Sequence, residues 1–274
     1  MDSNTQNNVL TIKTVQIAPF RILITALKDI LTDTNIIFTK EHIKIINMDK
    51  THTILVHLLL KAENFEFFNC KYDRIIIGVN MLHLFKLISS IDNDDTLTLY
   101  IENEDYVEGV VHELGLKFEN GDIKQSKIQK LRLIEPELEE LEIPDLIFSS
   151  VINLPSSDFQ KIIRDLANIS DKLEIKSVDN ELIFKCVGQY AKAEIRRTES
   201  ENSMQFLQKQ NSNEIIQGEF SLKNLIYFIK CTNLCSQIEI YLENNRPLIV
   251  KYNVASLGEL KLCLASFPSN NSKK

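Results

Sequence analysis

The chain has 274 residues, 44% of them hydrophobic and 25% charged, and its formal net charge is −7. This length fits one large domain or two smaller ones, with enough apolar residues for a substantial core. The acidic balance argues against a protein that is basic over its whole surface and coats nucleic acid, although it leaves room for local basic patches. No apolar run approaches the length of a membrane span and the polar N-terminus has no signal-peptide core, so we expect no membrane partner.

The first predicted element is an amphipathic helix in residues 19–30. Its apolar residues recur at steps of three and four, which places them on one side of a helix. They are Phe20, Leu23, Ile24, Leu27 and Ile30. Residues 34–60 alternate between apolar and polar side chains, broken by polar turns, as in a meander of antiparallel strands. Residues 81–104 then predict a helix, a polar break and an alternating strand.

Residues 131–148 follow, and their composition is typical of a linker. Pro136 and Pro144 oppose regular structure, and acidic residues fill the stretch between them. We interpret this segment as an extended connector between a domain at 1–130 and a second domain at 149–274. A surface loop within one domain is the alternative.

The second half of the chain repeats the order of the first. Residues 158–169 have the spacing of the first helix, residues 171–197 begin with two alternating strands around a turn, and residues 222–245 repeat the helix, break and strand of 81–104. Phe20 aligns with Phe159 at an offset of 139, and Tyr100 aligns with Tyr241 at an offset of 141. Two independent segments at nearly one offset indicate an internal duplication.

No local motif predicts catalysis. The chain has seven glycines and no glycine-rich phosphate loop, helical histidine pair or nucleophile signature. The acidic run at 92–95 lies between a predicted helix and strand, where turn formation explains it better than a metal site. The five cysteines lie in apolar segments, which predicts buried, reduced thiols. We therefore expect no enzyme, no metal site and no cofactor.

The polar faces of the predicted helices carry cations. The spacing of three or seven residues within each pair places its members on one face of a helix. These cations are Arg21, Lys28, Lys86, Lys161, Arg164, Lys223 and Lys230. An ordinary solvated face of mixed charge is one interpretation, because aspartates interrupt the pattern. The other is a set of point charges that contact phosphates without reading bases.

An ordered set of segments resembles the sliding clamps of the proliferating cell nuclear antigen family, from about Leu10 to Ala265. The segments are ALKDIL, INMDKTHTILVHLLLKAENFEFFNC, IIIGVN, LEELEIPD, LPSSDFQKIIRDLANISD and RPLIVKYNVASLGELKLCLA. The resemblance implies an α+β fold with two similar clamp domains per chain, antiparallel sheets outside and two helices per domain inside. It implies a homotrimeric ring around duplex DNA that serves as a polymerase processivity factor and a docking platform in replication and repair.

The resemblance also assigns roles to residues by position. The seven cations named above fall where the family has inner-wall cations, whereas Ile22, Ser89 and Asn168 replace groups that are usually basic or titratable. Segment 131–148 corresponds to the interdomain connector, where DNA polymerase, the clamp loader and other proteins dock through short peptides. The implied peptide-binding residues are Met48, Leu55, Leu141, Ile143, Pro247, Cys263 and Ala265. Core packing is the plain alternative for these apolar residues.

Ring closure by this family implies pairing between subunits, and we expect it to join residues 126–133 to residues 182–195. Residues 112–125 look longer than the family norm, which leaves their local pairing open. A subunit of a heterotrimeric clamp, of the checkpoint or archaeal type, is the alternative to a homotrimer, and an enzyme with an unrecognised site is a third reading. We expect a nuclear location, or a viral replication site if the source is a large DNA virus.

Overall fold

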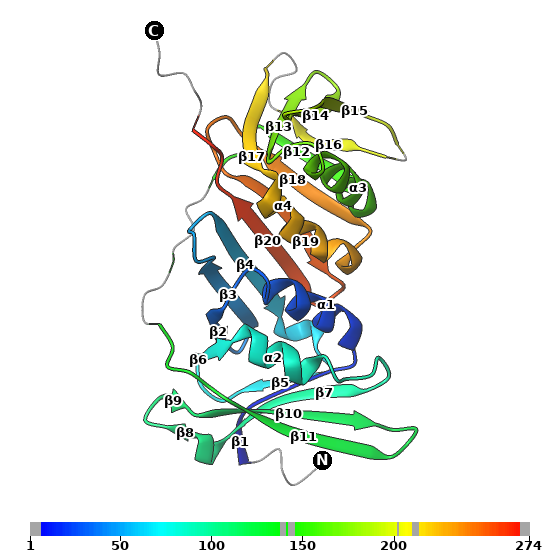
Figure 1. Cartoon of the computed structure of the whole chain (residues 1–274). Helices are drawn as coiled ribbons and strands as arrows, with labels where there is room; N and C mark the ends of the chain where they lie inside the picture. Colours follow the sequence, from blue (N-terminus) through cyan, green and yellow to red (C-terminus); the bar gives the residue numbers. More distant parts are fainter. Residues whose placement is uncertain (1–6, 138–140, 142–145, 202, 210–213, 269–274) are drawn as a thin grey trace. The chain divides into compact units, whose positions relative to one another are not determined.

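The computed structural model describes residues 7–137, 141, 146–201, 203–209 and 214–268 (Figure 1). It divides into two compact units. The first contains residues 1–50, 56–141 and 254–260, and the second contains residues 51–55, 142–253 and 261–274. The boundary at 141 lies inside the predicted connector. The division also differs from two contiguous domains, because short segments near 51–55 and 254–260 group with the other unit.

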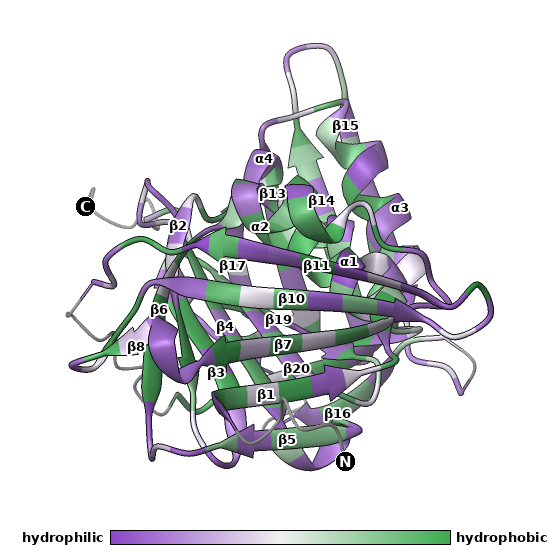
Figure 2. Ribbon diagram, turned by 90° about the horizontal axis from the view of Figure 1, so that it is seen from below, coloured by the Kyte–Doolittle hydropathy of each residue, from purple (hydrophilic) through white to green (hydrophobic). Residues whose placement is uncertain are grey.

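The first unit contains a five-stranded antiparallel sheet in the order β11-β10-β7-β1-β5. Its strands are β1 (Asn8–Thr14), β5 (Phe67–Cys70), β7 (Thr96–Glu102), β10 (Glu113–Asn120) and β11 (Gln125–Arg132). Figure 2 shows hydrophobic and hydrophilic residues alternating along these strands, as expected for a sheet with one face on the core. Leu97, Leu99 and Ile101 supply the buried side of β7.

Four further strands of this unit lie in the order β4-β3-β2-β6. They are β2 (Asp33–Phe38), β3 (His42–Met48), β4 (Ile54–Lys61) and β6 (Ile75–Asn80), and a small hairpin adds β8 (Tyr106–Val107) and β9 (Val110–Val111). The helices are α1 (Ile17–Leu27) and α2 (Met81–Ile88), with short 3-10 turns η2 (Ala62–Asn64) and η3 (Asn103–Asp105). The predicted meander in residues 34–60 is therefore present as β2, β3 and β4.

The second unit is built from the same kinds of helices and strands as the first. One set of strands lies in the order β16-β12-β18-β19, and a separate sheet lies in the order β15-β14-β13-β17. The strands are β12 (Ser150–Pro155), β13 (Lys172–Val178), β14 (Glu181–Val187), β15 (Lys192–Thr198), β16 (Gln205–Lys209), β17 (Ile216–Ser221), β18 (Gln237–Leu242) and β19 (Leu248–Val254). The helices are α3 (Ser156–Ala167) and α4 (Leu222–Phe228), followed by the 3-10 helix η4 (Ile229–Leu234), and the last strand is β20 (Gly258–Leu264).

The two units are copies of one topology. The sheet order β15-β14-β13-β17 repeats β4-β3-β2-β6, and β19-β18-β12-β16 repeats β10-β7-β1-β5. Helices α2 and α4 both start one residue after a side-chain cap: Asn80 accepts from the His83 N–H, and Ser221 accepts from the Asn224 N–H. These caps are 141 residues apart, the offset predicted for this segment, and a polar cap satisfies otherwise unpaired N–H groups at a helix start.

Backbone hydrogen bonds next to the ends of β4 and β20 lie within each unit. Lys61 donates its backbone N–H to Leu257 in the first unit, and Ala265 donates its N–H to Thr53 in the second. By the duplication, β4 corresponds to β15 and β20 corresponds to β11. In the described part of the chain, however, β11 and β15 are each the terminal strand of their sheet. These two strands therefore present open edges.

Several local predictions can be compared with the structure. The apolar residues predicted to line one side of each repeated helix are buried, except Ile169, which is half-buried. Strand β11 continues to Arg132, so the predicted connector begins two residues inside a strand. Residues 113–132 pair without interruption as the β10–β11 hairpin. Four cysteines are buried and Cys235 is half-buried. No helix of the described residues is long and apolar enough to cross a membrane.

Candidate functional site

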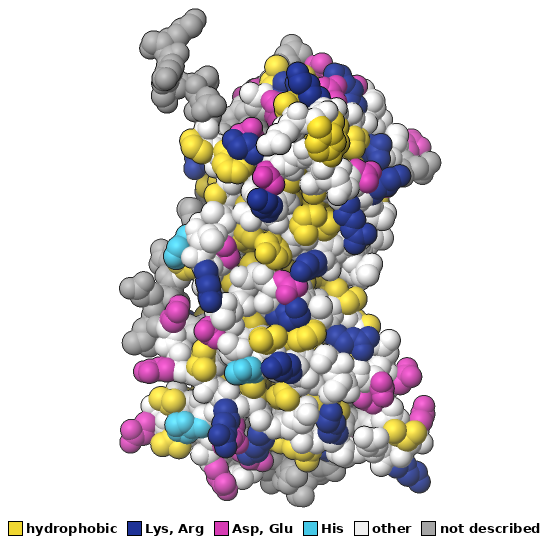
Figure 3. Space-filling view, viewed as in Figure 1, with side chains coloured by type: hydrophobic (Ala, Val, Ile, Leu, Met, Phe, Trp, Pro, Cys, Tyr) yellow, Lys and Arg dark blue, Asp and Glu magenta, His cyan; other side chains and the backbone are white. Residues whose placement is uncertain are grey.

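The helix faces of the two units are built alike. Helix α1 packs beside α2 in the first unit, and α3 packs beside α4 in the second. Buried residues such as Leu23, Leu84, Phe159 and Leu225 hold these helices against the strands. The opposite side of each helix is then left to solvent, and Figure 3 shows lysine and arginine side chains on this side of each unit.

Five of the seven predicted cations are exposed. Lys86, Lys161 and Arg164 make no ion pair with another described residue, so their charges face solvent. The Lys223 ammonium lies 3.4 Å from Asp171, but both side chains are about three-quarters exposed, and such a pair contributes little. The Lys230 ammonium lies 5.3 Å from the centre of the Tyr227 ring. These five side chains offer positive charge without a deep pocket or a rigid geometry, which suits phosphate contact rather than base recognition.

The other two predicted cations are held within the fold. Arg21 donates from its guanidinium to the backbone oxygen of Ile91 at 2.9 Å and to the side chain of Asn93 at 2.6 Å. The Lys28 ammonium lies 2.6 Å from Asp29 and 4.8 Å from the centre of the Phe85 ring. Both side chains are half-buried. Arg21 therefore fixes the loop between α2 and β7, and the charge of Lys28 is largely offset.

The predicted pair Lys223 and Lys230 spans the end of a helix. Lys223 and Lys230 are seven residues apart, which would place them on one face of an α-helix. Helix α4, however, ends at Phe228, and Lys230 lies in the 3-10 helix that follows. A 3-10 helix turns about 120° per residue instead of about 100°, so the two steps from Phe228 to Lys230 shift the helical phase by only about 40°. Both lysines are exposed, but on separate elements.

Two cations that the sequence pattern missed also approach the helices. Lys127 on β11 donates to the Ser90 hydroxyl at 2.8 Å, just beyond the end of α2. Arg197 on β15 lies 3.9 Å from Asp158 in the first turn of α3. Each is far in sequence from the helix that it contacts. Only the fold of an edge strand beside a helix brings them together, so helical spacing offered no signal.

The residues predicted for peptide binding are found on both units and are described unit by unit. In the first, Met48 is half-buried at the end of β3, and Leu141 is 39% exposed. In the second, Leu55 and Pro247 are half-buried, Cys263 is buried and Ala265 is exposed. Ile143 lies outside the described residues. Burial raises the pKa of the Cys263 thiol to about 11, so this side chain is neutral and acts as a small apolar group.

Specific contacts hold both described ends of the predicted connector. At its start, Ile134 donates its N–H to Gly78 at 3.0 Å, and Glu137 exchanges hydrogen bonds with the Asn35 side chain. Just after its end, the Ser149 N–H and hydroxyl both donate to the Glu243 carboxylate. Burial alone would raise the pKa of Glu243, but the Ser149 and Asn244 hydrogen bonds outweigh it and lower the pKa. The connector therefore leaves and joins the two units at fixed points.

The acidic run at 92–95 forms the turn that its composition suggested. The Asp95 carboxylate accepts from the Asp92 N–H at 3.1 Å and from the Asn120 amide at 2.9 Å. Among the described residues there is no group of three or more His, Cys, Asp or Glu that could hold a metal ion.

Comparison with known proteins adds to this geometry. A family model described as "Proliferating cell nuclear antigen, N-terminal domain" matches residues 9–140, and the C-terminal domain model matches residues 142–267. The chain belongs to the proliferating cell nuclear antigen family. The matched ranges cover both structural copies, so the duplication seen in the fold is the family's pair of domains.

Several relatives share most of this sequence. The chain is 33% identical over 264 residues to a "Probable DNA polymerase sliding clamp 1" of Paramecium bursaria Chlorella virus 1, covering 94% of this chain and 97% of the relative. It is 32% identical to a "Probable DNA polymerase sliding clamp" of Acanthamoeba polyphaga mimivirus, over 84% of this chain but only 48% of that relative. It is 30% identical to the proliferating cell nuclear antigen of Chaetomium thermophilum, covering 89% and 92% of the two chains.

A solved structure has the same fold. The crystal structure of the proliferating cellular nuclear antigen of Entamoeba histolytica superposes with a TM-score of 0.84 at 25% sequence identity. The match covers 95% of this chain and 100% of the other. The α+β fold with two similar clamp domains, predicted from the sequence, is thereby confirmed.

Proposed function

We propose that this chain is a DNA sliding clamp, a ring subunit that encircles duplex DNA and acts as a processivity factor and docking platform for replication and repair proteins. The observation that carries the proposal is the duplicated fold with exposed cations on the helix face of both copies. Relatives named as DNA polymerase sliding clamps support it. The clamp is a scaffold and not an enzyme, acting at the nucleus or at a viral replication site.

The proposed ring is a homotrimer closed between β11 of one chain and β15 of the next. Unpaired strand edges must be covered or paired in a stable protein. Pairing of β11 of one chain with β15 of the next would cover both open edges. Ile128 on β11 is 60% exposed and would be buried by it. One kind of chain supplies both edges, which favours a homotrimer over a heterotrimer.

One charged residue on each of these edge strands is already paired within the chain. Lys130 on β11 lies 2.6 Å from Glu102 and 3.0 Å from Asp105, and hydrogen bonding to Glu102 is the main reason that its pKa is raised. Arg196 on β15 contacts Glu194 at 2.7 Å and Glu181 at 3.0 Å. Backbone pairing and apolar contact, rather than ion pairs, would then hold the ring closed. Light scattering after size exclusion should give about three chain masses at both low and high salt. A monomer without added partner would contradict the ring.

Contact with DNA is proposed to be weak, independent of sequence and dependent on ring closure. The five exposed helix cations supply the local positive charge. A ring loaded by a clamp loader should remain on closed circular DNA and leave a linear duplex from its ends. Equal loss from circular and linear DNA would show that retention is not topological, and would contradict the sliding-clamp proposal itself.

Partner proteins are proposed to dock as short peptides along the connector, against Met48, Leu55, Leu141, Ile143, Pro247, Cys263 and Ala265. The half-buried or exposed apolar side chains among these residues support an apolar contact surface. The test uses a labelled peptide with a glutamine, an aliphatic residue and two aromatic residues. Ile143→Glu should abolish its binding. Burying a carboxylate without a hydrogen-bonding partner costs at least about 2 kcal/mol of binding free energy. Lys61→Glu, at an exposed site, serves as the control, and equal affinity for wild type and Ile143→Glu would place the partner site elsewhere.

A further inference from the structure

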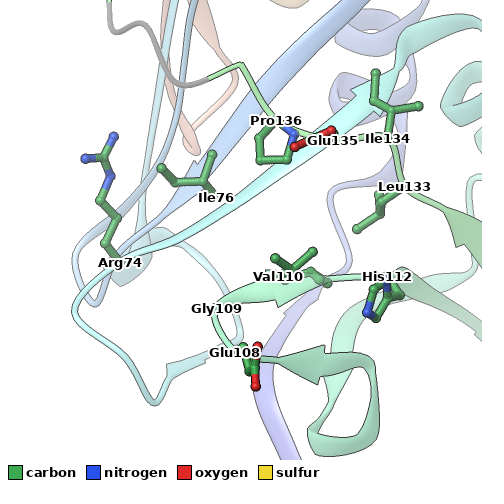
Figure 4. A pocket seen from close by; sticks show the side chains of 11 residues that line it. Arg74, Ile76, Glu108, Gly109, Val110, His112, Leu133, Ile134, Glu135 and Pro136 are labelled. Carbon is green, nitrogen blue, oxygen red and sulfur yellow. The ribbon is translucent and has the colours of Figure 1, made fainter.

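A cavity of about 550 Å³ in the first unit is used by none of the roles above. It lies between β6, the β8–β9 hairpin and the first residues of the connector (Figure 4). Its walls are mostly aliphatic and include Ile76, Val110, Val111, Leu133 and Ile134. Val110 is 48% exposed and Ile134 is 40% exposed, so the apolar lining is open to solvent. An exposed concave apolar surface of this kind is typical of a binding site.

One wall of the cavity is an open sheet edge. Strand β6 pairs with β2 on one side only, and among the described residues its outer edge has a single bridge, between Gly78 and Ile134. The N–H and C=O groups of alternate residues point to the same side of a strand. The backbone groups of Ile76 therefore point outward with those of Gly78, and no described residue of the connector pairs with them.

The path of the connector explains why this edge stays open. A Cβ atom on Gly78 would lie 2.5 Å from the Ile134 oxygen and 3.0 Å from the Glu135 backbone, so the chain passes directly over this glycine. Glu137 then exchanges hydrogen bonds with Asn35, which lies on β2 beyond β6. The connector thus crosses over β6 instead of running beside it.

The rim of the cavity carries a negative charge. Glu108 and Glu135 are both exposed, and neither forms an ion pair with another described residue. Figure 4 shows Glu135 with Pro136 on one side of the cavity and Glu108 with Val110 on the other. Arg74 lies at the β6 end. Two carboxylates beside aliphatic cavity walls favour a bound segment with an aliphatic side chain flanked by basic groups.

We propose that this cavity is a second docking site for partner proteins, which binds an extended segment as an added strand on the outer edge of β6. Side chains at every second position of a strand point to one face. The matching segment therefore has a valine-sized residue with lysine or arginine two positions away on each side. The aliphatic group enters the cavity, the basic groups meet Glu108 and Glu135, and the peptide backbone pairs with Ile76.

The test uses a fluorescein-labelled peptide with the central order lysine, serine, valine, serine, lysine, titrated against the full-length protein at low salt. The double variant Glu108→Lys/Glu135→Lys should weaken binding at least about tenfold, because it replaces two attractions with two repulsions. The matched control is Glu104→Lys/Glu201→Lys, which makes the same charge change at exposed residues outside the cavity and should leave affinity unchanged. An equal loss of affinity in both double variants would show that only the net charge of the protein matters, and it would overturn the proposal.

Two further measurements test strand addition and independence without relying on a protein variant. In an added strand, every second peptide N–H group faces the β6 edge. Methylation of the valine nitrogen and methylation of the adjacent serine nitrogen should therefore lower the affinity of the peptide by different amounts. Equal binding of the two methylated peptides would rule out strand pairing. A saturating peptide with the glutamine–aliphatic–diaromatic pattern should not displace the probe. Displacement would mean that both peptides use one site, which overturns this inference and leaves the connector proposal intact.

Discussion

Removing the exposed helix cations tests the proposed DNA-facing surface directly. The variant Lys86→Ala/Lys161→Ala/Arg164→Ala removes the three predicted helix cations that make no ion pair with another described residue, so no ion pair is lost with them. Each side chain is exposed, and we expect the fold and the ring to survive. The loss should therefore appear in DNA binding and polymerase stimulation rather than in stability.

The expected magnitude follows from counterion release. Each cation that contacts a phosphate of duplex DNA contributes about 0.9 to the slope of log K against log salt. Three contacts per chain are nine contacts in the proposed trimer, so the slope for binding of the ring should become shallower by up to about 8. The measurement is fluorescence anisotropy of a labelled duplex over a series of salt concentrations, repeated with wild type and variant at the same protein concentration.

The control variant must change the net charge of the protein by the same amount as the helix variant. Lys50→Ala/Lys61→Ala/Lys185→Ala also takes the net charge per chain from −7 to −10, but it removes exposed lysines that lie outside the four helices. Its salt slope should match that of wild type. If this control flattens the slope as much as the helix variant, total charge and not the helix face governs binding. If the helix variant keeps the wild-type slope, the assignment of the DNA-facing surface is wrong.

Three other predictions concern stability, measured by urea unfolding. Arg21→Ala should lower the free energy of unfolding by about 1.5–3 kcal/mol, because hydrogen bonds from a charged group are lost, while leaving the DNA salt slope nearly unchanged; a large change in slope would contradict its structural role. Glu243→Gln should be less stable than wild type at neutral pH. Because the folded pKa of Glu243 is lowered, its contribution is present above its ordinary value of 4.5 and is lost as the pH falls through the folded value, so the difference between the two proteins should shrink in acid. A constant difference would show that the carboxylate charge is not involved. Phe159→Ala should cost about 3–5 kcal/mol because this ring is fully buried, whereas Phe67→Ala, at a 44% exposed ring, should cost much less.

Much of the fold follows from local patterns in the sequence. Helical spacing places Phe20, Leu23, Phe159 and Ile162 on buried faces, and all four are buried. The offset of 141 between the two helix–strand segments holds for the helix caps as well as for the strands. These features are set by residues within about two turns of each other or by repetition, and a single sequence contains that information.

Whether a predicted site residue faces solvent or is held within the fold depends on contacts with residues far away in the sequence. A local sequence pattern does not reveal those contacts. Arg21 has the same helical position as a solvent-facing cation, but the loop at 91–93 captures its guanidinium from about 70 residues away. Lys230 lies beyond the end of α4, in the 3-10 helix that follows. The cavity beside β6 arises where the connector crosses Gly78, and its lining comes from segments around 74–76, 108–112 and 133–136. No periodicity links such segments.

The distribution of charge bears on how the proposed ring would hold DNA. Three chains would carry 3 × −7 = −21, so the assembly as a whole repels a duplex at long range. Of the seven cations on the helix face, Arg21 is bound to its own chain and Lys28 is offset by Asp29. The remaining five are exposed, flexible side chains whose contacts with phosphate are readily exchanged. A closed ring with such a surface gains its residence on DNA from enclosure, and the weak contacts let it move along the duplex. Strengthening these contacts should therefore slow movement: Ser89→Arg, at an exposed position after α2, should steepen the salt slope and lower the diffusion of the loaded ring, as followed by single-molecule fluorescence. Faster movement or an unchanged slope would place position 89 away from the duplex.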